Sequence, residues 1–128
     1  MMPPDRVLLP SVILVVEDEM LLRMRAVDMV EDAGYLPVEA VDADEALTIL
    51  QSRSDIALLF TDIQMPGSMN GLQLALAVHE RWPRIKIILA SGQLKLSKLD
   101  IPENSRFFAK PLDSGDMVAE IREMLGHA

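Results

Sequence analysis

The sequence predicts a doubly wound α/β domain, in which parallel strands alternate with helices along the chain. Short, uniformly apolar runs recur, as expected for strands covered on both faces. These runs are VILVV (12–16), IALLF (56–60), IKIILA (85–90) and RFFA (106–109). Segments whose apolar residues recur at helical spacing lie between most of them. Strands joined by helical crossovers form parallel sheets, so the two observations favour the same fold class.

Composition narrows the possible functions. The chain has 128 residues, enough for one domain with a core, and half of them are apolar. It has no cysteine, which excludes a disulfide framework and a thiolate metal site. A net charge of −8 argues against binding to nucleic acid or to an anionic membrane. No apolar run approaches the roughly 20 residues of a membrane span. We therefore expect a soluble, cytoplasmic domain.

The N-terminal residues superficially resemble a signal peptide. However, Pro10 interrupts the apolar run, acidic residues follow at once, and no small-residue cleavage site is present. We therefore interpret residues 12–16 as the first buried strand. Residues 1–10 are expected to form a flexible tail, and residues 11–126 the domain.

The remaining elements carry start and stop signals. A fifth strand candidate, YLPVEAV (35–41), contains Pro37, which cannot donate to a ladder, so this strand belongs on a sheet edge. Each predicted helix is bounded by a capping or breaking residue. The helical segments are 21–34, 42–50, 70–83 and 113–126. Gly34 ends the first of them, and Asp42 begins the second with Glu45 in a capping-box-like pattern. Pro83 ends the third, and Asp113 and Gly126 bound the one nearest the C-terminus.

The segment 93–105 is irregular. A helical crossover between parallel strands needs about a dozen residues, and Pro102 with its polar neighbours uses up the end of this short segment. We expect a shortened or irregular fourth helix here, a single helical turn or a mobile loop. Its apolar residues are expected to contact the core: Leu94, Leu96, Leu99 and Ile101.

Reactive side chains follow the predicted strands. In an open α/β sheet, ligands bind beyond the carboxyl ends of the strands. At those ends stand an acidic cluster, a lone acid, a hydroxyl and an amine: Glu17-Asp18-Glu19, Asp62, Ser91 and Lys110. Taken singly, each has an ordinary explanation, such as a first-turn acid favoured by the helix dipole, a cap or a turn. Their convergence on one rim favours a shared chemical role.

Two or three adjacent carboxylates repel one another, and one stays protonated unless a cation joins them. A hard cation such as Mg²⁺ prefers oxygen ligands and suits this cluster. An aspartate beside a metal and a lysine can attack phosphorus and form an aspartyl phosphate. The metal and the lysine would neutralise the charge of the transferring phosphoryl group.

Over residues 11–126 the chain resembles the receiver domain of two-component response regulators. The resemblance lies in five motifs, which occur in this order along the chain: VVEDE, TDIQMPG, NGLQLA, IILASG and FFAKP. Each motif alone is weakly specific, and the ordered set is strongly specific. The resemblance implies a flavodoxin-like sheet of five parallel strands in the order 2-1-3-4-5. This order agrees with an edge position for the strand that contains Pro37.

The resemblance also implies residue roles. Asp62 would be the phosphoacceptor, and Mg²⁺ would bind Glu17, Asp18, Asp62 and the backbone carbonyl of Gln64. Ser91 would capture the phosphoryl group, Lys110 would be the amine of the site, Phe107 the switch aromatic, and the Lys110–Pro111 bond cis.

Several positions depart from the family pattern. Glu17 stands where Asp is commoner, and the loop MPGSMNG is one residue longer than usual. Phe107 replaces the frequent Tyr, so it offers no hydroxyl and fits a core position equally well. The connection from Ser91 to Lys110 is shorter than usual, which again places the fourth helix in doubt.

The implied function is a stand-alone receiver without an output domain, phosphorylated by a histidine kinase or histidine phosphotransfer protein and acting on an unknown downstream protein. It would not be an enzyme beyond autophosphorylation and autodephosphorylation. A degenerate receiver that binds partners without phosphorylation is one alternative. The other is a phosphohydrolase of the haloacid-dehalogenase type, which needs a second Asp where Gln64 stands.

Overall fold

The computed structural model describes residues 11–92 and 101–126. Five parallel strands form one sheet in the order β2-β1-β3-β4-β5, as expected. They are β1 (Val12–Val16), β2 (Leu36–Ala40), β3 (Ile56–Asp62), β4 (Lys86–Ser91) and β5 (Ser105–Ala109). The described residues also form four helices, α2 (Met20–Asp32), α3 (Ala43–Ser52), α4 (Gly71–Arg81) and α5 (Ser114–Leu125).

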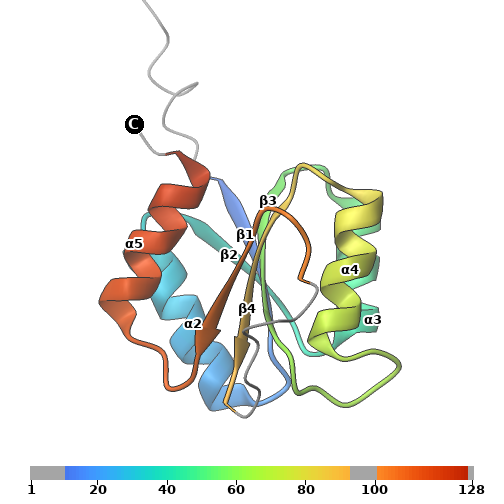
Figure 1. The fold of residues 1–128 in the computed structure, drawn as a ribbon, viewed down its shortest axis with the longest axis horizontal. Helices are drawn as coiled ribbons and strands as arrows, with labels where there is room; N and C mark the ends of the chain where they lie inside the picture. The colour runs from blue at the N-terminus through green and yellow to red at the C-terminus, as the bar shows by residue number, and fades with distance from the viewer. Residues whose placement is uncertain (1–10, 93–100, 127–128) are drawn as a thin grey trace, which may run out of the picture.

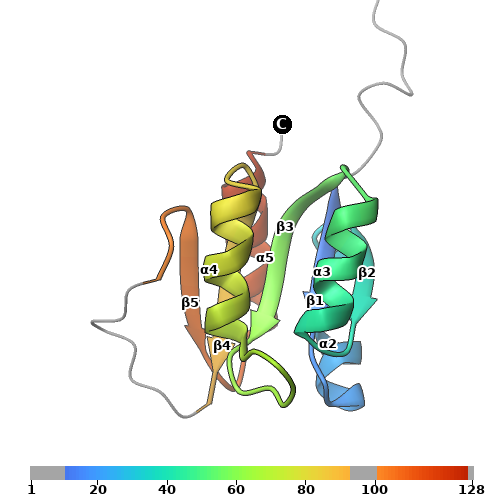
Figure 2. The same ribbon diagram turned by 90° about the vertical axis from the view of Figure 1, so that its right-hand side faces the viewer.

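The sheet is the middle of three layers. Helices α2 and α5 cover one face, and α3 and α4 cover the other (Figures 1 and 2). Along β1, Ile13 and Val15 pack into the core beneath α2 and α5, while Leu14 and Val16 pack into the core beneath α3 and α4. Because both faces are covered, every position of β1 is buried, which explains why its sequence is uniformly apolar.

The edge prediction for the second strand is confirmed. β2 contains Pro37 and, among the described strands, pairs only with β1, so it forms one edge of the sheet. Its residues are mostly exposed or half-buried, unlike those of β1. An edge strand tolerates proline because one side of its backbone has no ladder partner to lose.

Side chains cap the helices largely as predicted. The Asp42 carboxylate accepts a hydrogen bond from the Glu45 amide at 2.8 Å, and Asp113 caps α5 in the same way. The Glu45 carboxylate accepts from the Val41 amide at 2.7 Å, so the second half of the capping box is displaced by one residue. Gly126 ends α5 with φ 61°, a left-handed conformation that favours glycine.

The predicted fourth helix falls mainly on residues 93–100, which lie outside the described residues, as do Leu94, Leu96, Leu99 and the tail 1–10. The described end of this connection, residues 101–104, is not helical. Ile101 packs against the core on the α3 and α4 face, as expected. Among the described residues, no helix has the length and hydropathy needed to cross a membrane.

Candidate functional site

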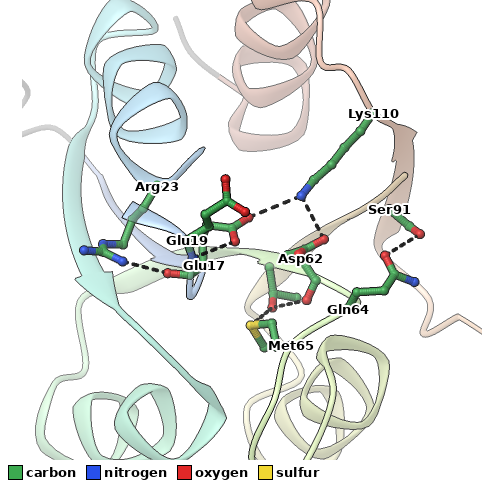
Figure 3. Close-up of polar contacts among 9 residues, drawn as sticks. Glu17, Glu19, Arg23, Asp62, Gln64, Met65, Ser91 and Lys110 are labelled. Atoms are coloured by element: carbon green, nitrogen blue, oxygen red, sulfur yellow. Dashed lines mark hydrogen bonds and ion pairs between the residues drawn. The ribbon is translucent and has the colours of Figure 1, made fainter. Parts of the chain in front are cut away.

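The carboxyl ends of β1 and β3 bring the predicted acids together (Figure 3). The two strands are neighbours, and Val16 lies opposite Thr61, so the next residues, Glu17 and Asp62, are adjacent. Carboxylate oxygens of Glu17, Asp18 and Asp62 lie within 4.8 Å of one another. Glu17 is 3% exposed and Asp62 5% exposed, whereas Asp18 is open to solvent.

Lys110 joins this cluster from the end of β5. Its Nζ lies 3.1 Å from Asp62 Oδ1 and 3.3 Å from Glu17 Oε1. The Lys110–Pro111 peptide bond is cis, as the family resemblance implied. The Lys110 amide donates to the Ser91 carbonyl at 2.9 Å, which fixes the start of the lysine side chain beside β4. From there the side chain reaches past β4 to both acids (Figure 3).

The electrostatics of the site follow from burial and crowding. Burial raises the pKa of Asp62, the contact with Lys110 partly opposes this rise, and the charge of Asp18 adds to it. Burial likewise raises the pKa of Glu17. The hydrogen bond from the Glu19 amide partly opposes this rise, and repulsion by the Asp62 charge adds to it. For Lys110, burial lowers the pKa, but its contacts with Asp62 and Glu17 outweigh this and the net direction is up.

The donor set fits a hard divalent cation. Among the residues that the structure describes, three carboxylates face one ammonium group, so negative charge is in excess there. Asp62 Oδ1 is buried and, apart from its ion pair with Lys110, accepts no hydrogen bond from any described residue. All the ligand atoms offered are oxygens, and one acid is open to solvent, an arrangement that suits Mg²⁺ with retained waters.

Backbone contacts hold the β1–α2 loop. The Glu19 amide donates to Glu17 Oε2 at 3.1 Å, and Arg23 Nη1 donates to the Glu17 carbonyl at 2.9 Å. Arg23 Nε also pairs with Glu39 Oε1 of β2 at 3.0 Å. Sequence reasoning missed Arg23 and Glu39. A cation one turn after an acid cluster was a usable signal, but its partner on β2 depends on strand pairing.

On the other side of Asp62, the Ser91 hydroxyl donates to Gln64 Oε1 at 2.8 Å (Figure 3). Asp62 lies opposite Ala90 in the β3–β4 ladder, and the Ile63 amide donates to the Ala90 carbonyl, so Ser91 faces the loop that follows β3. The sequence prediction for Gln64 concerned its backbone carbonyl. The contact of its side chain with Ser91 was not predicted.

Gly71 is a further residue that sequence reasoning missed. A Cβ at this position would overlap the Asp62 carbonyl oxygen, and the Gly71 amide donates to the Ile63 carbonyl at 2.9 Å. Asn70 and Gln73 cap α4 reciprocally, which fixes the helix start against the end of β3. The longer loop is tied to α3 by Ser68, whose hydroxyl donates to Asp44 at 2.7 Å.

Phe107 lies on the edge strand β5 and is half-buried. Its ring packs against the core on the α3 and α4 face, and Leu89 of β4 lies opposite it in the ladder. A half-buried ring on an edge strand satisfies both interpretations of this residue, a core position and a mobile aromatic.

Comparison with known proteins places the chain in a family. The model of the response regulator receiver domain matches residues 13–122. The solved CheY-like receiver domain protein from Methanospirillum hungatei JF-1 superposes with a TM-score of 0.81 at 26% identity, covering 91% of this chain and 94% of that one. The receiver domain of the hybrid histidine kinase CckA gives 0.76 at 28% identity, covering 90% and 99%. The chain belongs to the response regulator receiver domain family.

Curated relatives are longer proteins. The aerobic respiration control protein ArcA of Escherichia coli (strain K12) is 32% identical over 88% of this chain, which covers 48% of ArcA. The sensor kinase CckA of Brucella abortus (strain 2308) is 29% identical over 90% of this chain, which covers 12% of that kinase. The chain thus spans half or less of the length of these two relatives.

Proposed function

We propose that this receiver accepts a phosphoryl group on Asp62 from a histidine kinase or a histidine phosphotransfer protein, in a phosphorelay. The observation that carries the proposal is the environment of Asp62. Its side chain is 6% exposed, lies 3.1 Å from the Lys110 ammonium and shares a cluster with two further acids. An acid with only a structural role does not require burial, an ion pair with lysine and two neighbouring acids together.

In the proposed transfer, a carboxylate oxygen of Asp62 attacks phosphorus while the bond from phosphorus to the donor histidine nitrogen breaks. The departing histidine nitrogen takes up a proton, so the products are an aspartyl phosphate and a neutral histidine. Glu17, Asp18, Asp62 and the Gln64 backbone carbonyl would hold Mg²⁺, which when bound neutralises phosphoryl charge. Lys110 holds Asp62 in place before transfer and pairs with a phosphoryl oxygen afterwards.

Signal output is proposed to start at Ser91. Its hydroxyl would bind the transferred group, and Phe107 on the neighbouring strand would repack in response. The altered surface would then bind a downstream protein. We propose that the chain acts in the cytoplasm, where histidine kinases transfer phosphoryl groups, and that its chemistry is limited to phosphorylation and dephosphorylation of Asp62.

Incubation with Mg²⁺ and acetyl phosphate, followed by intact-mass measurement and mapping of the modified residue, tests this proposal. We expect one phosphoryl group on Asp62 and none on the Asp62→Asn variant. Asp28→Asn, which removes an exposed acid of α2, is the matched control and should be modified like the unchanged protein. Modification of Asp62→Asn would show that another residue is the acceptor. A complete absence of modification would favour the degenerate receiver.

A further inference from the structure

The contact between Ser91 and Gln64 occupies the hydroxyl that is proposed to capture the phosphoryl group. Ser91 is 1% exposed, so its hydroxyl needs a partner within the protein, and Gln64 Oε1 provides one at 2.8 Å. Gln64 itself is half-buried, and water can reach its amide when the contact breaks.

A serine hydroxyl carries a single hydrogen. It can donate that hydrogen to the Gln64 amide oxygen or to an oxygen of a group on Asp62, but not fully to both. Ser91 and Gln64 lie at the end of β4 and in the loop after β3, on the same side of Asp62 (Figure 3). Capture of the phosphoryl group by Ser91 thus requires that the bond to Gln64 be given up.

We propose that Gln64 is a positioning residue that acts as a latch on Ser91, holding its hydroxyl in the unphosphorylated protein and opposing its move to Asp62. This inference rests on the proposed function and adds a determinant of the switching equilibrium. A neutral hydrogen bond contributes about 0.5–1.5 kcal/mol, so the latch should reduce phosphoryl capture by about 2- to 10-fold.

Gln64→Met tests the latch, because methionine is unbranched and of similar length but a poor hydrogen-bond acceptor. We expect beryllofluoride, a phosphoryl mimic, to bind this variant about 2- to 10-fold more tightly than the unchanged protein in the presence of Mg²⁺. Phosphorylation by acetyl phosphate should also be faster in the Gln64→Met variant. Gln51→Met, at an exposed position of α3, is the matched control and should leave both quantities unchanged.

A double-mutant cycle separates the latch from a general packing effect. In a Ser91→Ala background the latch has nothing to hold, so Gln64→Met should no longer change beryllofluoride affinity. An equal gain in both backgrounds would overturn the latch, and so would no change or a loss with Gln64→Met alone.

The same experiment distinguishes the two proposals. If the unchanged protein neither binds beryllofluoride nor takes up phosphate on Asp62, the proposed function falls and the latch with it. If it does both and Gln64→Met behaves like the unchanged protein, only the latch falls. Thermal unfolding of each variant, expected to remain a single cooperative transition, shows that the fold is intact.

Discussion

The two sides of Asp62 are built differently. On the β1 side, residues 17–23, the contacts involve backbone atoms: the Glu19 amide and the Arg23 guanidinium both bind Glu17, whose own amide donates to Ala40 of β2. On the β4–β5 side, the reactive groups themselves bind other side chains: the Ser91 hydroxyl binds the Gln64 amide oxygen, and the Lys110 ammonium binds the Asp62 carboxylate.

This difference matches two different tasks. A cation site needs carboxylates held in fixed positions before the ion arrives, and contacts with the backbone provide that. A switch needs groups that can exchange partners, and contacts between side chains can break without disturbing the strands that carry them. We infer that the β1 side is preorganised and that the β4–β5 side is rearranged by phosphorylation.

Among substitutions on the two sides of Asp62, Lys110→Ala is expected to have the largest effect on phosphorylation. Loss of the ammonium should slow phosphorylation by acetyl phosphate roughly 100-fold or more, because a preorganised charge opposite the transferring group is lost. The pKa of Asp62 should rise further, since the lysine lowers it. Stopped-flow kinetics and NMR titration measure these two quantities. Lys86→Ala, at the opposite end of β4, is the control, and unfolding of the Lys110 variant would instead indicate a structural role.

Asp18→Asn tests the β1 side. Removing one carboxylate of the cluster should weaken Mg²⁺ binding by roughly 10-fold or more and slow phosphorylation at limiting Mg²⁺. Isothermal titration calorimetry measures the affinity. If the affinity for Mg²⁺ were unchanged, the metal assignment would be wrong.

The pH dependence of Mg²⁺ binding follows from the raised pKa values of Glu17 and Asp62. Protons compete with the metal for these carboxylates, so affinity should be full above both raised values and fall as pH decreases through them. The loss should therefore begin at a higher pH than for ordinary carboxylates. Without metal the sign is opposite: the folded state binds these protons more tightly than the unfolded state, so their contribution to stability decreases as pH rises. Thermal unfolding with Mg²⁺ and with EDTA from pH 5 to pH 8 measures both.

The smallest effect is expected from Arg23→Ala. The guanidinium positions the Glu17 carbonyl from 2.9 Å and is itself held by Glu39, which is half exposed. We expect Mg²⁺ affinity to fall about 5-fold, the equivalent of one hydrogen bond, with phosphorylation at saturating Mg²⁺ unchanged. Arg25→Ala, an exposed neighbour on the same helix, should have no effect. A slower rate at saturating Mg²⁺ would show that the two sides are not separable.

Much of the fold was predictable because its determinants are local. The uniform apolar runs identified the buried strands, Pro37 placed its strand on an edge, and Asp42 and Asp113 began their helices. The strand order came from family resemblance, since propensity and periodicity do not encode which strands pair. The hydrogen bond of Glu45 shows a similar limit for a single contact. The sequence identified Glu45 as a capping residue, but it did not show that its carboxylate would accept from the Val41 amide.

For the site, the sequence by itself determined the inventory: acids after two strands, a hydroxyl and an amine after two others, and the expectation that they meet at one rim. Only the tertiary structure decided which atoms face one another. The contacts Arg23–Glu39, Gln64–Ser91 and Lys110–Glu17 join residues far apart in the chain, and the fit of Gly71 against Asp62 depends on where α4 begins. Such contacts depend on strand register and side-chain direction, which are fixed when the layers pack and leave no periodic signal in the sequence.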